Sequence, residues 1–138
     1  MTATILDGKA LAGKIQAEIA EEIVDFIQDN GCVPCLAAVL VGNVPGSDVY
    51  IRNKRKACER VGIESQLHRL PEAATEEDLL TLVAKLNKDR QVHGILVQLP
   101  LPKQIPTRQI LQAISPSKDV DAFHPENVGR LIQGRPRF

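Results

Sequence analysis

Residues 35–41 read Cys-Leu-Ala-Ala-Val-Leu-Val, an unbroken apolar run that ends at Gly42. A strand with apolar side chains on both faces is typical of a parallel sheet that helices cover on both sides. Before this run, from Asp7 to about Asn30, apolar residues recur at helical spacing, and Asn30-Gly31 is a suitable helix end. A predicted helix, with Asp7 as its N-cap, therefore leads into a predicted buried strand.

The alternation of helix and strand patterns continues along the chain. Thr75-Glu76-Glu77-Asp78 resembles a capping box with Asp in the Glu position, and it opens one of the predicted helices. We predict an α/β fold, a three-layer α/β/α arrangement whose mainly parallel sheet is built from βαβ units with right-handed crossovers. The predicted helices cover residues 47–60, 75–88 and 107–114, and the further strands cover residues 63–70 and 94–99.

Composition limits the classes of partner. The 138 residues are enough for one domain, and 17 basic residues balance 17 acidic ones, so we expect no nucleic-acid partner. The N-terminal residues lack the basic and apolar segments of a secretory signal, and no apolar run has the roughly 20 residues of a membrane span. We therefore expect a cytoplasmic protein with no membrane partner.

The three cysteines include a C-x-x-C motif at Cys32–Cys35. A thioredoxin-like site has this motif after a strand, at a helix N-terminus, whereas here it follows a predicted helix and opens a strand. A zinc site needs a second pair of ligands, and none stands at suitable spacing. We expect ordinary structural cysteines and no metal site.

The first candidate functional segment follows the apolar run at residues 35–41. Ser47, Tyr50 and Lys54 are spaced by three and four residues, so they share one face of the predicted helix. A Tyr ring beside a Lys amine can stack a flat ligand while the amine transfers protons. The alternative is that Tyr50 packs and Lys54 is a solvated charge. Neither a G-x-G-x-x-G fingerprint nor a complete phosphate-binding P-loop is present.

Two further segments carry polar residues in unusual places. Gln98 interrupts an apolar strand, and a buried amide must find hydrogen-bond partners, so it is either a satisfied core residue or part of a site. Asp121 belongs to an acidic loop, Lys118-Asp119-Val120-Asp121-Ala122-Phe123-His124-Pro125. This loop is either part of a site or a solvated turn without a function. We assign no role to His124.

Together the three segments resemble one family, the N-terminal catalytic domain of bifunctional methylenetetrahydrofolate dehydrogenase/methenyltetrahydrofolate cyclohydrolase. Residues 41–63 fit the signature V-G-x-x-x-x-S-x-x-Y-(V/I)-x-x-K-x-K-A-x-x-x-x-G-I, and residues 94–102 fit G-(I/L)-(L/I)-V-Q-L-P-L-P. Residues 116–131 fit P-x-K-D-V-D-G-x-x-x-x-N-x-G-x-L, except that Ala122 replaces the glycine. If that position has a positive φ angle, alanine there costs roughly 1 kcal/mol or more.

The resemblance implies a role for each candidate residue. Lys54 matches the catalytic lysine, Tyr50 stacks on the aromatic part of the folate, and Asp121 holds the amino-pyrimidine edge of the pterin through charge-assisted contacts. Gln98 would hydrogen-bond Lys54 and Ser47 would support it, while backbone groups of Val97 and Leu99 line the folate site. Lys54, Gln98 and Asp121 are thus the catalytic candidates, and we expect Lys54 to act in turn as base and acid.

The implied reactions are oxidation of 5,10-methylenetetrahydrofolate to the methenyl form with NADP, or in some members NAD, and hydrolysis to 10-formyltetrahydrofolate. We expect residues 1–138 to form the folate-binding catalytic domain, with residues 127–138 starting the linker to an absent Rossmann domain that carries the cofactor site. In the family a final helix returns to the first domain. The full-length enzyme is expected to be a homodimer.

Two other interpretations stay open. The first is a non-catalytic folate-binding remnant, and the second is an α/β ligand-binding or regulatory module. A response-regulator receiver, the obvious module, needs an Asp at a strand end, where this sequence has Gly42 and Pro100.

Overall fold

The computed structural model describes residues 6–43 and 45–137 and contains a parallel sheet of three strands. The strands are β1 (Cys35–Val41), β2 (Glu64–Leu70) and β3 (Gly94–Val97), in the order β2-β1-β3. Ala38, in the middle of β1, lies opposite Leu67 of β2 and Leu96 of β3. The predicted parallel sheet, with the apolar run at its centre, is confirmed.

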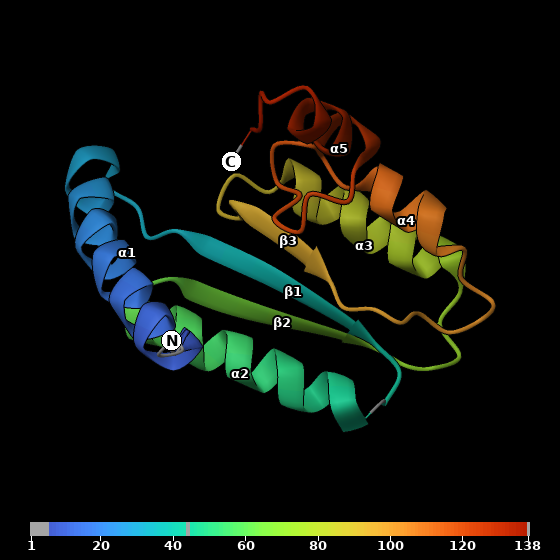
Figure 1. Ribbon diagram of the computed structural model, residues 1–138. Helices are drawn as coiled ribbons and strands as arrows, with labels where there is room; N and C mark the ends of the chain where they lie inside the picture. Colours follow the sequence, from blue (N-terminus) through green and yellow to red (C-terminus); the bar gives the residue numbers. More distant parts are fainter. Residues whose placement is uncertain (1–5, 44, 138) are drawn as a thin grey trace, which may run out of the picture.

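Helices cover both faces of the sheet, as Figure 1 shows. α1 and α2 lie on one side, and α3 and α4 lie on the other; α5 follows near the end of the chain. Alternate residues of β1 enter two apolar clusters. Val39 packs in the cluster that includes Leu79 of α3, whereas Ala38 packs with Ile51 of α2. The three-layer prediction is therefore confirmed. The helices are α1 (Gly8–Asn30), α2 (Pro45–Val61), α3 (Glu76–Lys88), α4 (Thr107–Ala113) and α5 (Pro125–Ile132).

The predicted helix ends are also confirmed. The Asp7 carboxylate accepts hydrogen bonds from the backbone N–H groups of Lys9 and Ala10, both at 3.0 Å. Gly31 ends α1 in the left-handed conformation, with φ 66°. Thr75 and Asp78 form the expected reciprocal capping box at the start of α3.

One predicted boundary is wrong, and one helix was not predicted. β3 ends at Val97, so Gln98 and Leu99 lie beyond the strand rather than within it. The unpredicted helix is α5, which covers Pro125–Ile132; that residues 127–138 start a linker stays a prediction. His124, to which we assigned no role, is the N-cap of α5, and its Nδ1 accepts a hydrogen bond from the Glu126 backbone N–H at 3.1 Å.

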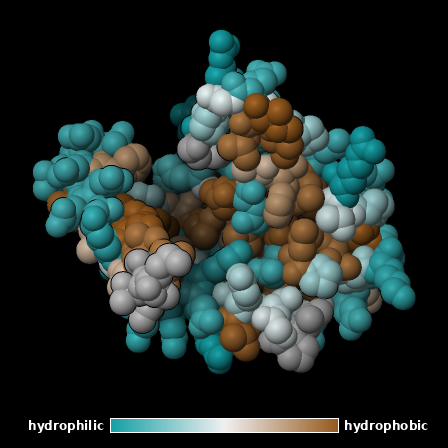
Figure 2. Space-filling view, in the orientation of Figure 1, coloured by the Kyte–Doolittle hydropathy of each residue, from teal (hydrophilic) through white to brown (hydrophobic). Residues whose placement is uncertain are grey.

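α1 keeps much of its apolar surface uncovered. Only Ile23 of this helix is buried, while Leu11 is 59% exposed and Ile15 44% exposed. Figure 2 shows apolar residues on the inner side of α1, facing a hollow between this helix and the rest of the molecule. α1 therefore presents an unpartnered apolar stripe.

All three cysteines are free; Cys35 and Cys58 are buried and Cys32 is exposed. Within residues 6–43 and 45–137, no group of three or more His, Cys, Asp or Glu side chains is arranged to hold a metal ion. None of the helices in the described part of the chain has the length and apolar character to cross a membrane.

Candidate functional site

The candidate site lies where β1 and β3 end and α2 begins. In α/β sheets, ligands bind beyond the carboxyl ends of the strands. A pocket of about 360 Å³ opens there. It combines the start of α2 with the segment after β3, so residues from two of the predicted motifs meet. The lining residues are Gly46, Ser47, Tyr50, Gln98, Leu99 and Pro100.

α2 presents the first group of predicted residues on one face. Ser47 is buried, with 6% of its surface exposed, whereas the Tyr50 ring is 63% exposed. Lys54 is partly buried, and its Nζ lies 5.5 Å from the centre of the Tyr50 ring, within cation–π distance. The predicted pairing of ring and amine is therefore present, with ring surface still open for a ligand.

Gln98 is held at the edge of the pocket by its backbone and its amide nitrogen. Its N–H donates to the Val39 carbonyl at 2.9 Å, and its Nε2 donates to the Leu99 carbonyl at 2.8 Å. Its Oε1 is buried and has no hydrogen-bond partner among the described residues. The Gln98–Lys54 hydrogen bond that the resemblance implies is therefore not formed here, and Oε1 remains a free acceptor. Gln98 is not the fully satisfied core residue of the alternative interpretation.

Val97 and Leu99 differ in their access to the pocket. Leu99 lines it, but the Val97 side chain is buried in the apolar cluster on the α3 side of the sheet. A contact between a ligand and the Val97 backbone stays a prediction.

Asp121 does not line the pocket, but its carboxyl interacts electrostatically with Lys54. Loss of water around its carboxyl raises the pKa above the usual value, and the nearby Asp119 charge raises it further, whereas the positive charge of Lys54 lowers it. The residue as a whole is nevertheless exposed to solvent. The charge of Lys54 is close enough to Asp121 to act on its carboxyl.

A buried network that the sequence reasoning missed holds the Asp121 loop. Asp119 is 1% exposed, and its Oδ2 accepts hydrogen bonds from the His124 backbone N–H at 2.8 Å and from Asn127 Nδ2 at 3.0 Å. Asn127 Nδ2 also donates to the Pro116 carbonyl at 2.9 Å. The loop is thus tied to the first turn of α5. Both Asp119 and Asp121 belong to the motif at residues 116–131, but the sequence does not indicate which of the two carboxylates is buried.

The other end of this loop is tied to the sheet and to α3. The Ile95 N–H donates to the Lys118 carbonyl at 2.7 Å. Lys118 Nζ donates to the carbonyls of Leu86 and Asp89 at 3.0 and 2.6 Å, at the C-terminal end of α3, where a cation is favoured.

Ala122 has the left-handed backbone conformation. A positive φ angle is the condition under which alanine, in place of the glycine of the family pattern, costs free energy. The φ angle of Ala122 is 55°, and this is the one non-glycine residue of the described chain with a positive φ. An L-residue with a Cβ pays roughly 1–2 kcal/mol in this region. The loop that presents Asp121 therefore carries local strain at a position where the family pattern has glycine.

Comparison with known proteins finds one family. Residues 6–121 match the family described as tetrahydrofolate dehydrogenase/cyclohydrolase, catalytic domain. The chain is similar to bifunctional protein FolD 2 of Geobacter metallireducens, with 58% identity over 135 residues that make up 98% of this chain and 47% of the relative. It is similarly close to bifunctional protein FolD of Geotalea daltonii, with 58% identity over 99% of this chain and 48% of that protein. The chain thus spans about half the length of the relatives it matches.

Solved structures show the same relationship. The bifunctional enzyme FolD, a methylenetetrahydrofolate dehydrogenase/cyclohydrolase, from Campylobacter jejuni has a TM-score of 0.91 at 51% identity, covering 95% of this chain and 46% of that one. The Trypanosoma brucei methylenetetrahydrofolate dehydrogenase-cyclohydrolase, solved with NADP cofactor and inhibitor, has a TM-score of 0.90 at 38% identity, covering 95% and 45%.

Proposed function

The chain belongs to the tetrahydrofolate dehydrogenase/cyclohydrolase family through its catalytic domain, and we propose that it supplies the folate site and the catalytic lysine of such an enzyme. The reactions are oxidation of 5,10-methylenetetrahydrofolate to the methenyl form and hydrolysis of that form to 10-formyltetrahydrofolate. The observation that carries the proposal is a pocket lined by Tyr50 and Gln98, with Lys54 Nζ over the Tyr50 ring. The charge of Lys54 also acts on the Asp121 carboxyl.

The aromatic part of the folate stacks on Tyr50. The ring is open on the pocket side, and Lys54 Nζ stands over the same ring, so a ligand lying against Tyr50 has the amine beside it. The Asp121 carboxylate then accepts hydrogen bonds from the amino-pyrimidine edge of the pterin, a charge-assisted pairing. Leu99 and Pro100 form the apolar wall across the pocket.

Lys54 moves the protons of the hydrolysis. In its neutral form the amine takes a proton from the attacking water, and in its charged form it returns a proton to the folate nitrogen. Gln98 Oε1, buried without a partner, is the acceptor that would orient the ammonium once a ligand brings Lys54 towards the strand end. An unpaired buried amide oxygen costs about 1–3 kcal/mol, which such a contact would recover.

The cofactor does not fit this chain. The sequence has no G-x-G-x-x-G, the fingerprint of the phosphate-binding turn in a dinucleotide site. We place NADP, or NAD, on a further Rossmann domain of a longer protein, where it accepts the hydride of the oxidation. The length of the relatives and the uncovered apolar stripe of α1 support a partner domain, and a homodimer of the longer enzyme is part of the same proposal.

A folate titration tests the proposal. The purified chain, followed by fluorescence or calorimetry with 5,10-methenyltetrahydrofolate, should bind weakly but saturably. Tyr50→Ala should weaken binding by about tenfold, because a stacked aromatic contact is worth roughly 0.5–1.5 kcal/mol beyond its buried area. Tyr50→Phe is the matched control and should bind like the wild type. Equal affinity for Tyr50→Ala would remove Tyr50 from the site, and absence of binding by the folded chain would contradict a folate site on these residues alone.

A further inference from the structure

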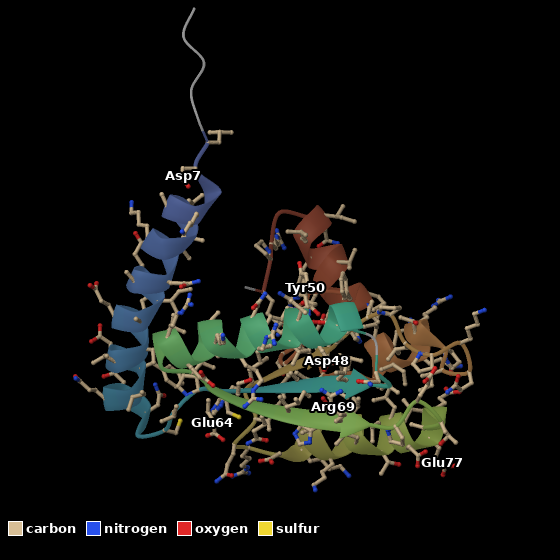
Figure 3. The ribbon with its side chains drawn as sticks, turned by 90° about the horizontal axis from the view of Figure 1, so that it is seen from below. Asp7, Asp48, Tyr50, Glu64, Arg69 and Glu77 are labelled. Carbon is tan, nitrogen blue, oxygen red and sulfur yellow. The ribbon has the colours of Figure 1, made fainter. Side chains whose placement is uncertain are left out.

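α2 has a second polar flank that the folate proposal does not use. Figure 3 shows Tyr50 on one side of α2 and Asp48, beside Arg69 of β2, on the other. A groove of about 390 Å³ runs along this second flank, between α2 and the edge strand β2, and it shares no lining residue with the pocket at Tyr50. Its lining residues are Asp48, Ile51, Arg52, Arg55, Lys56, Glu59, Leu67 and Arg69.

The groove is positive although the whole chain is neutral. Asp48 and Arg69 form an ion pair at 2.5 Å, so they cancel as charges and fix one wall. Arg52, Arg55 and Lys56 remain, against Glu59 alone. None of these four takes part in an ion pair within 4.0 Å among the described residues. The groove therefore has an excess of two positive charges on a chain whose formal net charge is zero.

One donor in the groove has no acceptor. Arg55 Nε is buried and has no hydrogen-bond partner in the described part of the chain. Leaving a buried donor of a charged group unsatisfied costs free energy, and an anion in the groove would remove that cost. The guanidinium groups of Arg52 and Arg55 present planar forks of N–H donors, which suit oxyanions better than a lysine ammonium does.

The floor of the groove is apolar. Ile51 is 2% exposed, and Leu67 is partly buried against the same cluster. A ligand in this groove therefore meets charged donors on its walls and aliphatic groups beneath them.

We propose that the groove between α2 and β2 is a binding site for a phosphate group. A phosphate carries a charge of about −1.5 to −2 at pH 7 and three acceptor oxygens, matching the two excess charges and the unpaired donor. This site is separate from the folate pocket and does not depend on the proposed function.

Nuclear magnetic resonance of the ¹⁵N-labelled 138-residue chain tests the assignment, because arginine Nε–H groups give their own signals. Sodium phosphate is titrated at pH 7.5 against sodium chloride of equal ionic strength. Saturable shifts of the Arg55 and Arg52 Nε–H signals are expected. Arg55→Gln should raise the phosphate Kd about tenfold, the loss of one charge-assisted hydrogen bond.

Three controls keep the result interpretable. Lys88→Gln removes an equal charge from the exposed end of α3 and should leave the phosphate Kd unchanged. Tyr50→Ala should also leave it unchanged, because Tyr50 lines only the other pocket. Phenyl phosphate distinguishes two sources of the group: tighter binding than inorganic phosphate indicates a phosphate ester over the apolar floor, and equal binding indicates free phosphate.

The proposal is overturned if the shifts rise linearly and equal those in chloride. It is also overturned if Arg55→Gln and Lys88→Gln weaken binding equally, or if acetate binds as tightly as phosphate. Should Arg55→Gln alter the backbone spectrum, Arg52→Gln provides the same test from the neighbouring wall.

Discussion

Replacing Ala122 by glycine should stabilise the protein, although glycine usually destabilises. Ala122 has a φ of 55°, and the left-handed region costs a residue with a Cβ roughly 1–2 kcal/mol. Glycine removes that strain but adds about 0.4–1 kcal/mol of conformational entropy to the unfolded chain. The difference is a net gain of about 0.8 kcal/mol in the free energy of unfolding. With an unfolding entropy of about 2.1 cal/mol/K per residue, this raises Tm by about 3 °C.

Thermal and urea unfolding, followed by circular dichroism, measure this gain. Ala84→Gly is the matched control, because Ala84 is exposed in the middle of α3, where glycine costs about 1 kcal/mol. The two identical substitutions should therefore shift Tm in opposite directions. A neutral or destabilised Ala122→Gly protein would show that Ala122 is not strained in this loop. The same variant should bind folate at least as tightly, since the loop presents Asp121.

The other predictions concern the loop, the lysine and pH. Asp119→Ala should lower the free energy of unfolding by about 2–3 kcal/mol, because the His124 N–H and one N–H of the Asn127 amide lose their acceptor. Urea unfolding measures the loss, and a change below about 0.5 kcal/mol would contradict the network. Lys54→Met, placed in an enzyme that contains both domains, should abolish hydrolysis of the methenyl folate in an absorbance assay, and near-normal turnover would overturn the assignment. Because the pKa of Asp121 is raised, its ionised form is less favourable in the folded state than in the unfolded state. Asp121→Asn should therefore be more stable than wild type at pH 7, and this difference should vanish below the unfolded carboxyl pKa of about 3.9; a constant difference across the pH series would show that the shift has another cause.

The layers of the fold could be predicted because the apolar run at residues 35–41 indicates a strand that is covered on both faces. β1 is covered on both faces, as a parallel strand between two layers of helices is, and its alternate residues enter two separate clusters. Local signals also predicted the caps correctly, since Asp7 and the Thr75–Asp78 box act through residues two or three positions away.

α5 was missed although three of its residues, Val128, Leu131 and Ile132, are apolar and recur at helical spacing. They stay 40%, 61% and 81% exposed, so they do not hold the helix in the fold. Its one buried residue is the polar Asn127, which is tied to the Asp121 loop. The start signals were nevertheless present, since His124 caps the helix and Pro125 occupies its first position.

The site residues were predictable as a group, but their partners were not. Helical spacing was enough to place Tyr50 and Lys54 together. The partners of Gln98 depend on the path of the chain after Val97, where β3 ends. Asp119 and Asp121 are two residues apart and would share a face in an extended strand, but a turn separates them and buries only Asp119.

The most direct test of the folate site is to map the ligand on the molecule. Backbone ¹H–¹⁵N spectra of the chain, recorded during titration with 5,10-methenyltetrahydrofolate, report which residues it contacts. We predict saturable shifts at Ser47, Tyr50, Gln98 and Leu99 and at the Asp121 loop, and none along the groove between α2 and β2. Saturable shifts confined to that groove, or to the inner side of α1, would contradict it.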